Sequence, residues 1–465
     1  MNDTVIIIGG GISGLATAWF LHRRGINVTV LEEKEHVGGM IHSSTDAGYL
    51  LEHGPNSTLQ KPGDTSDALG RLVTDLGLES RLRVADPRAA RRYVYRNRQL
   101  HPLPGSPPAF IRTPLFSWQA KMRLLAEPFI KRGVDDNESI AAFVTRRLGR
   151  EFLHYAVGPF ISGVYAGDPE QLAVAAAVPR IHDLERTHGS LIRGAIALGR
   201  LRKTTGMPAG RLISFDSGMA LLPQTIAERL PAHTIRVDTR VTALTPLATG
   251  GWCLNWRSST GEQGELRGSR VVLALPAAVA SRLLAAFCPE AATLLAGIVY
   301  AAIAVLGVAW PRAAVGHPLD GFGFLVPRRE GIRTLGALFS STLFSGRAPE
   351  GHALLTTFIG GMTDPGVMTA DQQALTEQTI EELRRLLTIQ GAPDFLQLIR
   401  HARAIPQYGV GHLRRLQDLA VALRAYRGLY FRGNWQGGVS VADCVWNAEQ
   451  LALELAGRAV DFGAT

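Results

Sequence analysis

The first sixty residues carry short apolar runs on either side of a longer one. Four apolar residues at positions 5–8 lead at once into glycines, and the next ten positions are almost all apolar or small. The run "NVTVLEE" at 27–33 begins apolar and ends in two acids. Short apolar runs bounded by turn residues are typical of buried strands, and the longer run between them is typical of a helix. The pattern predicts a β-α-β unit with a glycine-rich continuation.

Further along the chain, strand patterns and helix patterns separate into blocks. Residues 100–175 begin with the proline-rich "HPLPGSPPAF" and continue in amphipathic helical pieces. Strand patterns occupy 234–244, 250–259, 269–276 and much of 300–360, whereas 371–390 has the spacing of an amphipathic helix. The end of the chain reads as strand, glycine turn and helix. We therefore expect one domain assembled from three separated segments, with other domains inserted.

One stretch raises the question of a membrane span. Residues 294–310, "LLAGIVYAAIAVLGVAW", carry no charge over 17 positions, which is the lower limit of length for a spanning helix. Two glycines, several β-branched residues and the following Pro311 favour a different interpretation. We predict the end of a helix that leads into a buried strand.

Composition narrows the protein class. A chain of 465 residues that is 46% apolar is long enough for two or three domains with sizeable cores. Basic residues outnumber acidic ones by 49 to 40, and only five of the basic residues are lysines. Arginine suits carboxylates and phosphates, but genomic base composition produces the same bias.

The metal-binding and redox-active residue types predict an intracellular protein without a metal. The three cysteines are scattered, which argues against a disulfide framework or a thiolate zinc site and fits a reducing cytoplasm. The thirteen histidines show no metal-ligand spacing with acids or cysteines. No targeting segment is expected before the first strand.

The first turn carries a dinucleotide fingerprint. Gly9, Gly11 and Gly14 have the G-x-G-x-x-G spacing between a predicted strand and a predicted helix, where they allow a tight turn, close approach of a pyrophosphate and close helix packing. The helix N-terminus then favours the phosphates. Glu32 lies 18 positions after Gly14, near the spacing of an acid that binds a ribose diol. A glycine turn beside a solvated acid is the alternative.

Three further features favour FAD over a nicotinamide cofactor. "HVGGM" at 36–40 adds a second glycine pair directly after the ribose acid, and "EHGPNST" at 52–58 adds a Gly-Pro turn. "GNWQGGVSV" at 433–441 places glycines before the last helix, whose N-terminal dipole would stabilise negative charge on a reduced flavin. A nicotinamide enzyme does not need both chain ends at one cofactor.

An ordered set of motifs over nearly the whole chain resembles the flavin-dependent protoporphyrinogen/coproporphyrinogen oxidase family. It includes "GGGISGLATAW", "LLEHGPNS", "RRYVYRNRQLHPLP", "PFISGVYAGDPEQL", "LDGFGFLVP", "FIGGMTDP", "AIPQYGVGH" and "GNWQGGVSVADCV". The resemblance implies an α/β fold with α+β insertions. Its parts would be a glutathione-reductase-like FAD-binding domain (1–70, 205–290 and 405–465), a mixed-sheet substrate domain (71–100 and 291–404) and a helical membrane-associating domain (101–204).

The resemblance also implies cofactor contacts, which fall on both ends of the chain. They are Gly9, Gly10, Gly11, Ile12, Ser13, Gly14, Glu32, Glu33, Met40, Gly54, Pro55, Asn56, Ser57, Val241, Asn434, Val439, Ser440 and Val441. His36 departs from the pattern, because the family usually has arginine before the second glycine pair; this departure would weaken a local contact.

The implied reaction is the FAD- and oxygen-dependent oxidation of protoporphyrinogen IX to protoporphyrin IX in heme biosynthesis. A tetrapyrrole needs apolar walls and a cation for its propionates. The family pattern puts the cation at Arg92, the walls at Leu325, Leu338 and Phe358, room for a pyrrole ring at Gly163, and a polar contact at Asn56. No side chain is predicted as a catalytic nucleophile or base, since the flavin carries the chemistry.

Other interpretations of the same residues remain open at this point. Without the resemblance, Leu325, Leu338 and Phe358 would be interpreted as ordinary core residues. Arg92 is one of seven arginines from Arg81 to Arg98, a cluster that also fits a nucleic-acid-binding surface. Coproporphyrinogen III, with four propionates, is the alternative substrate. An amine oxidase would need a lysine near the flavin, and none follows Lys203.

The expected partners are the porphyrinogen and dioxygen, with no nucleic acid. We expect a cytoplasmic enzyme that is peripheral on the cytoplasmic membrane, because its product is apolar and the chain has net positive charge. A soluble enzyme whose apolar helices pack on its body is the alternative, and a homodimer is left open.

Overall fold

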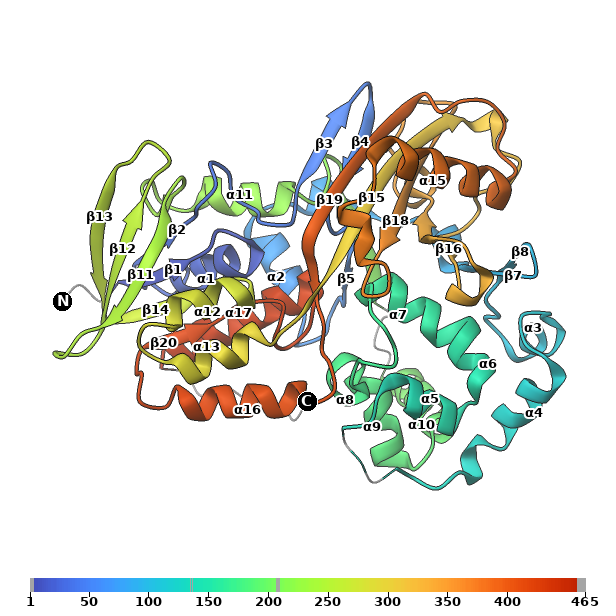
Figure 1. The fold of residues 1–465 in the computed structure, drawn as a ribbon, viewed down its shortest axis with the longest axis horizontal. Coiled ribbons are helices and arrows are strands. Elements are labelled where there is room, and N and C mark those ends of the chain that lie inside the picture. The colour runs from blue at the N-terminus through green and yellow to red at the C-terminus, as the bar shows by residue number, and fades with distance from the viewer. Residues whose placement is uncertain (1–3, 134, 136, 206–209, 458–465) are drawn as a thin grey trace.

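In the described part of the chain, five β-sheets and the helices packed on them form a mixed α/β structure (Figure 1). The computed structural model describes residues 4–133, 135, 137–205 and 210–457, without the side chains of 202–205. Residues 206–209 and 458–465, which fall within the predicted flavin domain, lie outside the described residues.

A five-stranded parallel sheet brings distant parts of the chain together. Its order is β10-β2-β1-β14-β20, with β10 (Ile235–Arg236), β2 (Val28–Leu31), β1 (Val5–Ile8), β14 (Arg270–Leu273) and β20 (Leu429–Phe431). Every residue of the central strand β1 is buried, as expected where both faces of a parallel sheet are covered. The first strand therefore has its neighbours near residues 28 and 270, and the sheet is completed only near residue 430.

Helices cover both faces of this parallel sheet. On one face, α1 (Ile12–His22) and α17 (Val441–Leu455) share a core with α2 (Ala68–Asp75) and α11 (Leu221–Arg229). Nearly all of α1 is buried, which explains why its sequence is apolar on every side. The other face packs against α12, α13, α16 and a three-stranded antiparallel sheet. These elements are α12 (Ala277–Leu284), α13 (Pro289–Ala296), α16 (His412–Ala422), β11 (Arg240–Pro246), β12 (Trp252–Arg257) and β13 (Gln263–Gly268).

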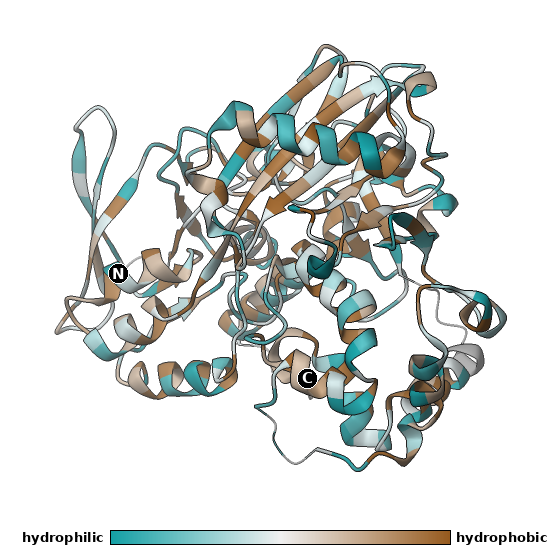
Figure 2. Cartoon of the chain, turned by 45° about the vertical axis from the view of Figure 1, so that its right-hand side comes forward, coloured by the Kyte–Doolittle hydropathy of each residue, from teal (hydrophilic) through white to brown (hydrophobic). Residues whose placement is uncertain are grey.

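A seven-stranded sheet forms the second large layer, in the order β19-β15-β18-β17-β16-β7-β8. Its strands are β19 (Phe395–Pro406), β15 (Tyr300–Pro311), β18 (His352–Gly360), β17 (Thr334–Leu338), β16 (Gly323–Leu325), β7 (Tyr93–Arg96) and β8 (Gln99–Pro102). Figure 2 shows the sheet strands as largely hydrophobic. Helix α15 (Gln372–Leu387) covers one face, where its leucines meet Leu306, Val308 and Leu355. Successive side chains of a strand point to opposite faces of the sheet, so the residues next to these three in their strands face away from α15.

The uncharged run 294–310 is divided between two elements. Helix α13 ends at Ala296 and β15 begins at Tyr300, so the predicted helix end leading into a buried strand is confirmed. Within the described residues, no helix combines the length and apolar character needed to cross a membrane.

Short helices form a third part, at the lower right of Figure 1. They are α3 (Pro107–Arg112), α4 (Trp118–Leu125), α5 (Ile140–Arg147), α6 (Arg150–Phe152), a π-helical turn (Leu153–Val157), α7 (Gly158–Tyr165), α8 (Val174–Ala177), α9 (Pro179–His188) and α10 (Leu191–Thr205). A fully buried ion pair between Arg147 and Glu127 lies in this part. The Arg147 guanidinium also donates to the carbonyl oxygens of Ile130 and Gly189, each at 2.8 Å.

Smaller elements connect these layers. They are β3 (Ser43–Asp46) with β4 (Tyr49–Glu52), the sheet of β5 (Thr58–Gln60), β9 (Arg211–Phe215) and β6 (Leu82–Val84), and the short helix α14 (Ser340–Leu343). Strand β4 packs against the large sheet, where Leu51 meets Ala309 and Leu354 on the face away from α15.

Candidate active site

The turn between β1 and α1 requires glycine for steric reasons. Gly9 has φ +109°, and a Cβ there would lie 2.4 Å from the Ala274 carbonyl oxygen. A Cβ at Gly14 would lie 2.0 Å from the Gly9 carbonyl oxygen. The backbone of the fingerprint therefore packs too closely for any side chain at these two positions.

The N-terminus of α1 lacks a cap from the protein. Its N-cap residue is Gly11, no side chain accepts a hydrogen bond from the first turn, and that turn holds no acid. The first N–H groups of a helix need acceptors, and phosphate oxygens are well suited to this role. Ile12 and Ser13 belong to this buried first turn, so the structure places them where the fingerprint predicts pyrophosphate contacts.

The acid after β2 turns toward the glycines. Glu32 is 7% exposed, and its carboxylate accepts hydrogen bonds from the Gly10 N–H at 2.6 Å and the Lys34 N–H at 2.9 Å. Glu33 behaves differently, because its side chain is exposed and lies 3.8 Å from Arg240. The structure thus brings Glu32 to the turn and leaves Glu33, also expected among the cofactor contacts, on the surface.

The second glycine pair lies directly against the first turn. The Gly38 N–H donates to the Gly10 carbonyl oxygen at 2.8 Å, and a Cβ at Gly39 would lie 3.1 Å from the Gly11 Cα. Met40 follows and is 39% exposed. His36, the departure from the family pattern, lies before this pair with its ring stacked on His42 at a centroid distance of 5.7 Å.

The Gly-Pro turn continues this path. A Cβ at Gly54 would lie 2.1 Å from the Met40 carbonyl oxygen, so residues 54–57 run beside Met40. Asn56 donates from Nδ2 to the Gly54 carbonyl oxygen at 3.2 Å, and Pro55 and Ser57 are half-buried. Burial, followed by the charges of His42 and His401, lowers the pKa of the preceding His53 to about 4. This imidazole is therefore neutral at pH 7.

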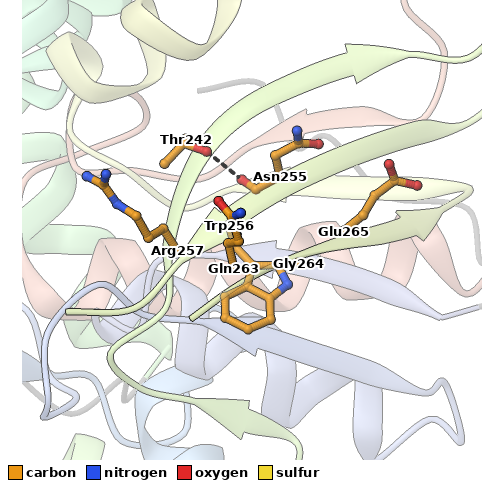
Figure 3. Close-up of a pocket in the computed structure, with 7 residues that line it drawn as sticks. All are labelled: Thr242, Asn255, Trp256, Arg257, Gln263, Gly264 and Glu265. Atoms are coloured by element: carbon orange, nitrogen blue, oxygen red, sulfur yellow. Dashed lines mark hydrogen bonds between the residues drawn. The ribbon is translucent and has the colours of Figure 1, made fainter. Parts of the chain in front are cut away.

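Val241 is placed at the edge of the parallel-sheet core. Its side chain packs against the cluster of Ile6, Ile8 and Leu273. A surface pocket of about 570 Å³ lies nearby on β11–β13 (Figure 3), lined by Thr242, Asn255, Trp256, Arg257, Gln263, Gly264 and Glu265. None of the predicted flavin or substrate residues lines it, so this pocket is separate from the candidate site.

The loop before α17 carries the C-terminal cofactor residues. Asn434 and Val439 are half-buried, Ser440 is the exposed N-cap residue, and Val441 is buried against α1. Ser440 and Asp443 form a capping box in which each side chain bonds the backbone N–H of the other. The Asp443 carboxylate already compensates part of the helix dipole. The expectation that this dipole stabilises a reduced flavin stays a prediction.

The predicted apolar walls share one face of the seven-stranded sheet. Strand register pairs Leu325 with Gly336 and Gly336 with Phe358, and it pairs Leu338 with Gly323. Because paired residues project to the same side and residues two apart do likewise, Leu325, Leu338 and Phe358 all face away from α15. Strand β4, which leads into the Gly54 turn, packs on this same face.

Helix α7 closes on this face at Gly163. A Cβ at Gly163 would lie 2.7 Å from Cδ2 of Leu325. In this structure the tip of the Leu325 side chain lies in the space that the missing side chain leaves, and the expectation that Gly163 gives room to a pyrrole ring stays a prediction. A substrate that uses this space would have to displace the Leu325 side chain.

Arg92 differs from most of its neighbouring arginines. Its guanidinium carbon lies 4.9 Å from the centroid of the Phe322 ring, a cation–π contact. Within the described part of the chain, no carboxylate lies within ion-pair distance of it. Five of the seven clustered arginines are paired, namely Arg81 and Arg83 with Asp216, Arg88 with Asp86, Arg91 with Asp320 and Arg96 with Glu151.

Phe322 connects this cation to the apolar face. Phe322 and Leu338 pack against the same small cluster of Ala89, Leu343 and Phe344. The arrangement thus offers an apolar face with an available guanidinium at one edge and the Gly54 turn on the same side. This is the geometry that an apolar ligand with an anionic edge would require.

Two sets of contacts around the site were missed from the sequence. Arg347 forms a buried ion pair with Glu52 at 2.6 Å, and Tyr408 donates to the carbonyl oxygen of Asn434 at 2.7 Å. Tyr408 lies in "AIPQYGVGH", one of the motifs that carried the family resemblance. The pairing of Arg347 with Glu52 across 295 positions leaves no periodic signal in a single sequence.

Comparison with known proteins identifies the family. The model for flavin-containing amine oxidoreductases matches residues 12–452. The chain belongs to this family. As a flavin-containing amine oxidoreductase with a dinucleotide fingerprint, it uses FAD as its cofactor. The bare glycine turns, the uncapped start of α1 and the inward-turned Glu32 fit that cofactor.

Individual relatives cover nearly the whole of this flavin-containing amine oxidoreductase. Chloroplastic protoporphyrinogen oxidase 1 from Arabidopsis thaliana is 34% identical over 97% of this chain and 87% of its own length. Coproporphyrinogen III oxidase from Bacillus subtilis is 29% identical over 95% of each chain. A crystal structure of a protoporphyrinogen oxidase candidate from Exiguobacterium sp. 255-15 has a TM-score of 0.81 at 23% identity, covering 98% of this chain and 99% of its own. This last similarity concerns the fold.

Proposed function

We propose that this protein oxidises protoporphyrinogen IX to protoporphyrin IX in heme biosynthesis, with FAD as cofactor and dioxygen as electron acceptor. The observation that carries the proposal is the available Arg92 guanidinium at the edge of the apolar sheet face. Relatives named for oxidation of protoporphyrinogen and of coproporphyrinogen III support the substrate class. The reaction removes six electrons, so three dioxygen molecules become three hydrogen peroxide molecules for each porphyrin.

In this proposal the protein binds and orients the substrate. The bound flavin supplies the hydride-accepting chemistry. Arg92 pairs with a propionate through a charge-assisted hydrogen bond, and Leu325, Leu338 and Phe358 hold the ring system while excluding water. Asn56 lies in the turn on the same side and offers a polar contact. Substrate binding would also have to move Leu325 from its place against Gly163.

The arginine pairings bear on the choice between two porphyrinogens. Coproporphyrinogen III carries four propionates and needs cations on more of its rim. Around Arg92, the neighbours Arg91 and Arg96 are already bound to Asp320 and Glu151. The pairing of most of these arginines within the protein supports the substrate that has only two propionates, on adjacent pyrroles, and coproporphyrinogen III remains the alternative.

The deciding experiment is anaerobic mixing of the FAD-loaded enzyme with each porphyrinogen. Loss of the oxidised-flavin absorbance with protoporphyrinogen, faster than with coproporphyrinogen, is the expected result. The reverse order would transfer the proposal to coproporphyrinogen III. Absence of bleaching with both substrates would overturn porphyrinogen oxidation altogether.

We further propose that the three parts of the structure act as separate domains. Residues 1–70, 205–290 and 405–465 would form a glutathione-reductase-like FAD-binding domain, 71–100 and 291–404 a substrate domain, and 101–204 a helical membrane-associating domain. Support comes from the separate cores around the parallel sheet, the seven-stranded sheet and the helices. Limited proteolysis that cuts near residues 100 and 205 without releasing flavin would support this division.

An exposed apolar stripe on the helical part supports peripheral membrane contact of a cytoplasmic enzyme. Trp118, Met122, Leu125 and Phe129 are 64, 50, 64 and 84% exposed, and their spacing places them on one side of α4 and the turn that follows. Such a stripe suits the interface of a membrane. In vesicle flotation, Trp118→Ser with Phe129→Ser should reduce binding, whereas Leu396→Ser, at an exposed leucine of β19, should not.

A further inference from the structure

We propose that Tyr408 and His412 are positioning residues that hold the flavin loop, residues 433–438, in the geometry that binds FAD. The inference rests on FAD binding, which is part of the proposed function, and it does not depend on the identity of the substrate. Both residues follow β19 of the large sheet, and His412 is the first residue of α16.

Tyr408 spans the flavin loop with a single hydroxyl. The side chain is 3% exposed. Its hydroxyl donates to the Asn434 carbonyl oxygen at 2.7 Å and accepts the Gly438 N–H at 3.1 Å. Burial raises the pKa of Tyr408, so the hydroxyl keeps the proton that it donates. One group therefore fixes both ends of the loop.

His412 holds the middle of the same loop. Its ring stacks on Tyr408 with a centroid distance of 4.5 Å and an interplanar angle of 8°. Its Nε2–H donates to the carbonyl oxygen of Trp435 at 3.0 Å, and the Trp435 indole N–H donates to the carbonyl oxygen of Leu275 at 3.0 Å. Burial lowers the pKa of His412 to about 4, so the stacked ring is neutral at pH 7.

The remaining anchors leave one side chain of the loop available. Asn447 donates to the Gly437 carbonyl oxygen at 3.0 Å, and Gln436 donates to the Phe431 carbonyl oxygen at 2.7 Å. The Asn434 side chain is half-buried and has no hydrogen-bond partner among the described residues. Its backbone is held by Tyr408, so its carboxamide can bind a ligand without having to break a protein hydrogen bond.

Tyr408 also connects this loop to the wall of the candidate substrate site. Its carbonyl oxygen accepts the Ala173 N–H at 2.9 Å. The adjacent Gln407 donates to the carbonyl oxygen of Tyr165, the last residue of α7, at 2.8 Å. Because α7 carries Gly163, one short segment sets the position of the flavin loop relative to the substrate face.

A matched tyrosine allows a clean test. Tyr426 also donates its hydroxyl to a backbone carbonyl, that of Phe287 at 2.5 Å. It packs with Trp252 and Phe287, and among the described residues its hydroxyl makes no hydrogen bond to the flavin loop. Tyr408→Phe and Tyr426→Phe thus remove the same hydroxyl group from a buried tyrosine and from a half-buried one. His412→Gln and His412→Phe form a second pair, since only glutamine can still donate to Trp435.

The test measures FAD binding by titrating apoprotein and records the midpoint potential of the bound flavin. We expect Tyr408→Phe to raise the FAD dissociation constant about ten-fold and to shift the potential, while Tyr426→Phe leaves both unchanged. His412→Gln should bind FAD more tightly than His412→Phe. Wild-type affinity and potential in both Tyr408→Phe and His412→Phe would overturn the proposal. If Tyr408→Phe does not fold, the His412 pair decides.

This result can be separated from the fate of the proposed function. FAD titration uses no porphyrinogen, so the positioning role can hold for an enzyme that oxidises neither substrate. Conversely, unchanged FAD binding in the variants, together with rapid flavin bleaching by protoporphyrinogen, would remove only the positioning role.

Discussion

Arg347 and Glu52, which are 295 positions apart in the chain, form an ion pair at 2.6 Å in which each side chain is only 3% exposed. The Arg347 guanidinium also donates to the Ser214 hydroxyl at 2.5 Å. Glu52 accepts the Ser43 hydroxyl at 2.5 Å and the Met219 N–H at 2.9 Å. The pair thus joins the loop after α14, beside the apolar face, to the strand that leads into the Gly54 turn.

Removal of one member of this pair should strongly destabilise the protein. Arg347→Met would leave the Glu52 carboxylate buried without its counter-charge, at a cost of about 3–5 kcal/mol in the free energy of unfolding. Urea denaturation followed by circular dichroism measures this loss. The double variant Arg347→Met with Glu52→Gln should recover part of it, and equal losses in the single and double variants would contradict the interpretation.

Arg92 should matter for substrate binding more than for turnover. Arg92→Ala would remove a charge-assisted bond to a propionate, raising KM more than it lowers kcat, with a loss of about 1.5–3 kcal/mol in kcat/KM. Steady-state oxidation of protoporphyrinogen measures both constants. Arg98→Ala, at another exposed arginine of the same cluster, is the control and should behave as wild type. Wild-type values of KM and kcat in both Arg92→Ala and Arg98→Ala would exclude Arg92 from the site.

Gly14→Ala should abolish FAD retention. Its Cβ would lie 2.0 Å from the Gly9 carbonyl oxygen, so the phosphate-binding turn would have to shift, and we expect the FAD content of purified protein to fall about ten-fold. Gly199→Ala is the matched control. A Cβ there meets nothing within 4 Å, so in helix α10 it should stabilise by about 0.5–1 kcal/mol. Wild-type FAD content in Gly14→Ala would contradict the assignment of this turn.

Stability should fall below neutral pH partly because of His412. Burial lowers its pKa from 6.5 to about 4, so the folded state binds fewer protons than the unfolded state between these values. Its stabilising effect is complete above pH 6.5 and is lost as the pH falls toward 4, with a total of about 3 kcal/mol. Urea unfolding at pH 7 and pH 5 should therefore show a smaller decrease for His412→Gln than for wild type. Equal decreases in the free energy of unfolding of wild type and His412→Gln would show that His412 does not cause this pH dependence.

The glycine turns and the β-α-β unit around the first of them could be predicted from sequence because their signals are local. Gly9, Gly11 and Gly14 interrupt an apolar run at a fixed spacing, and the split of residues 294–310 follows from β-branched residues before a proline. Which of the two acids turns toward the glycines could not be predicted from nearby residues. Glu32 is held there by the Gly10 N–H, whereas Glu33 lies beside Arg240, which is distant in sequence.

Features that depend on tertiary packing were outside the reach of one sequence. The sequence around Gly163 gives no sign that the side chain of Leu325, from a strand 162 positions later, lies against it. The Asp443 carboxylate partly compensates the helix dipole at the start of α17 through a capping box. The sequence shows this motif as Ser-x-x-Asp, but the glycines before it favoured the interpretation as a cofactor turn. The arginine cluster reads as one basic patch until Asp86, Asp216, Asp320 and Glu151 are placed against it.

The parallel sheet has a consequence for biosynthesis. Strand β1 is synthesised well before its neighbour β14, which follows some 260 residues later, and β20 and the loop beyond it come later still. Such long-range pairing delays folding and leaves hydrophobic edges open in the meantime. Cofactor capture must therefore await the synthesis of β14, β20 and the flavin loop, and the earlier part of the chain has to be shielded from aggregation until these partner strands are made.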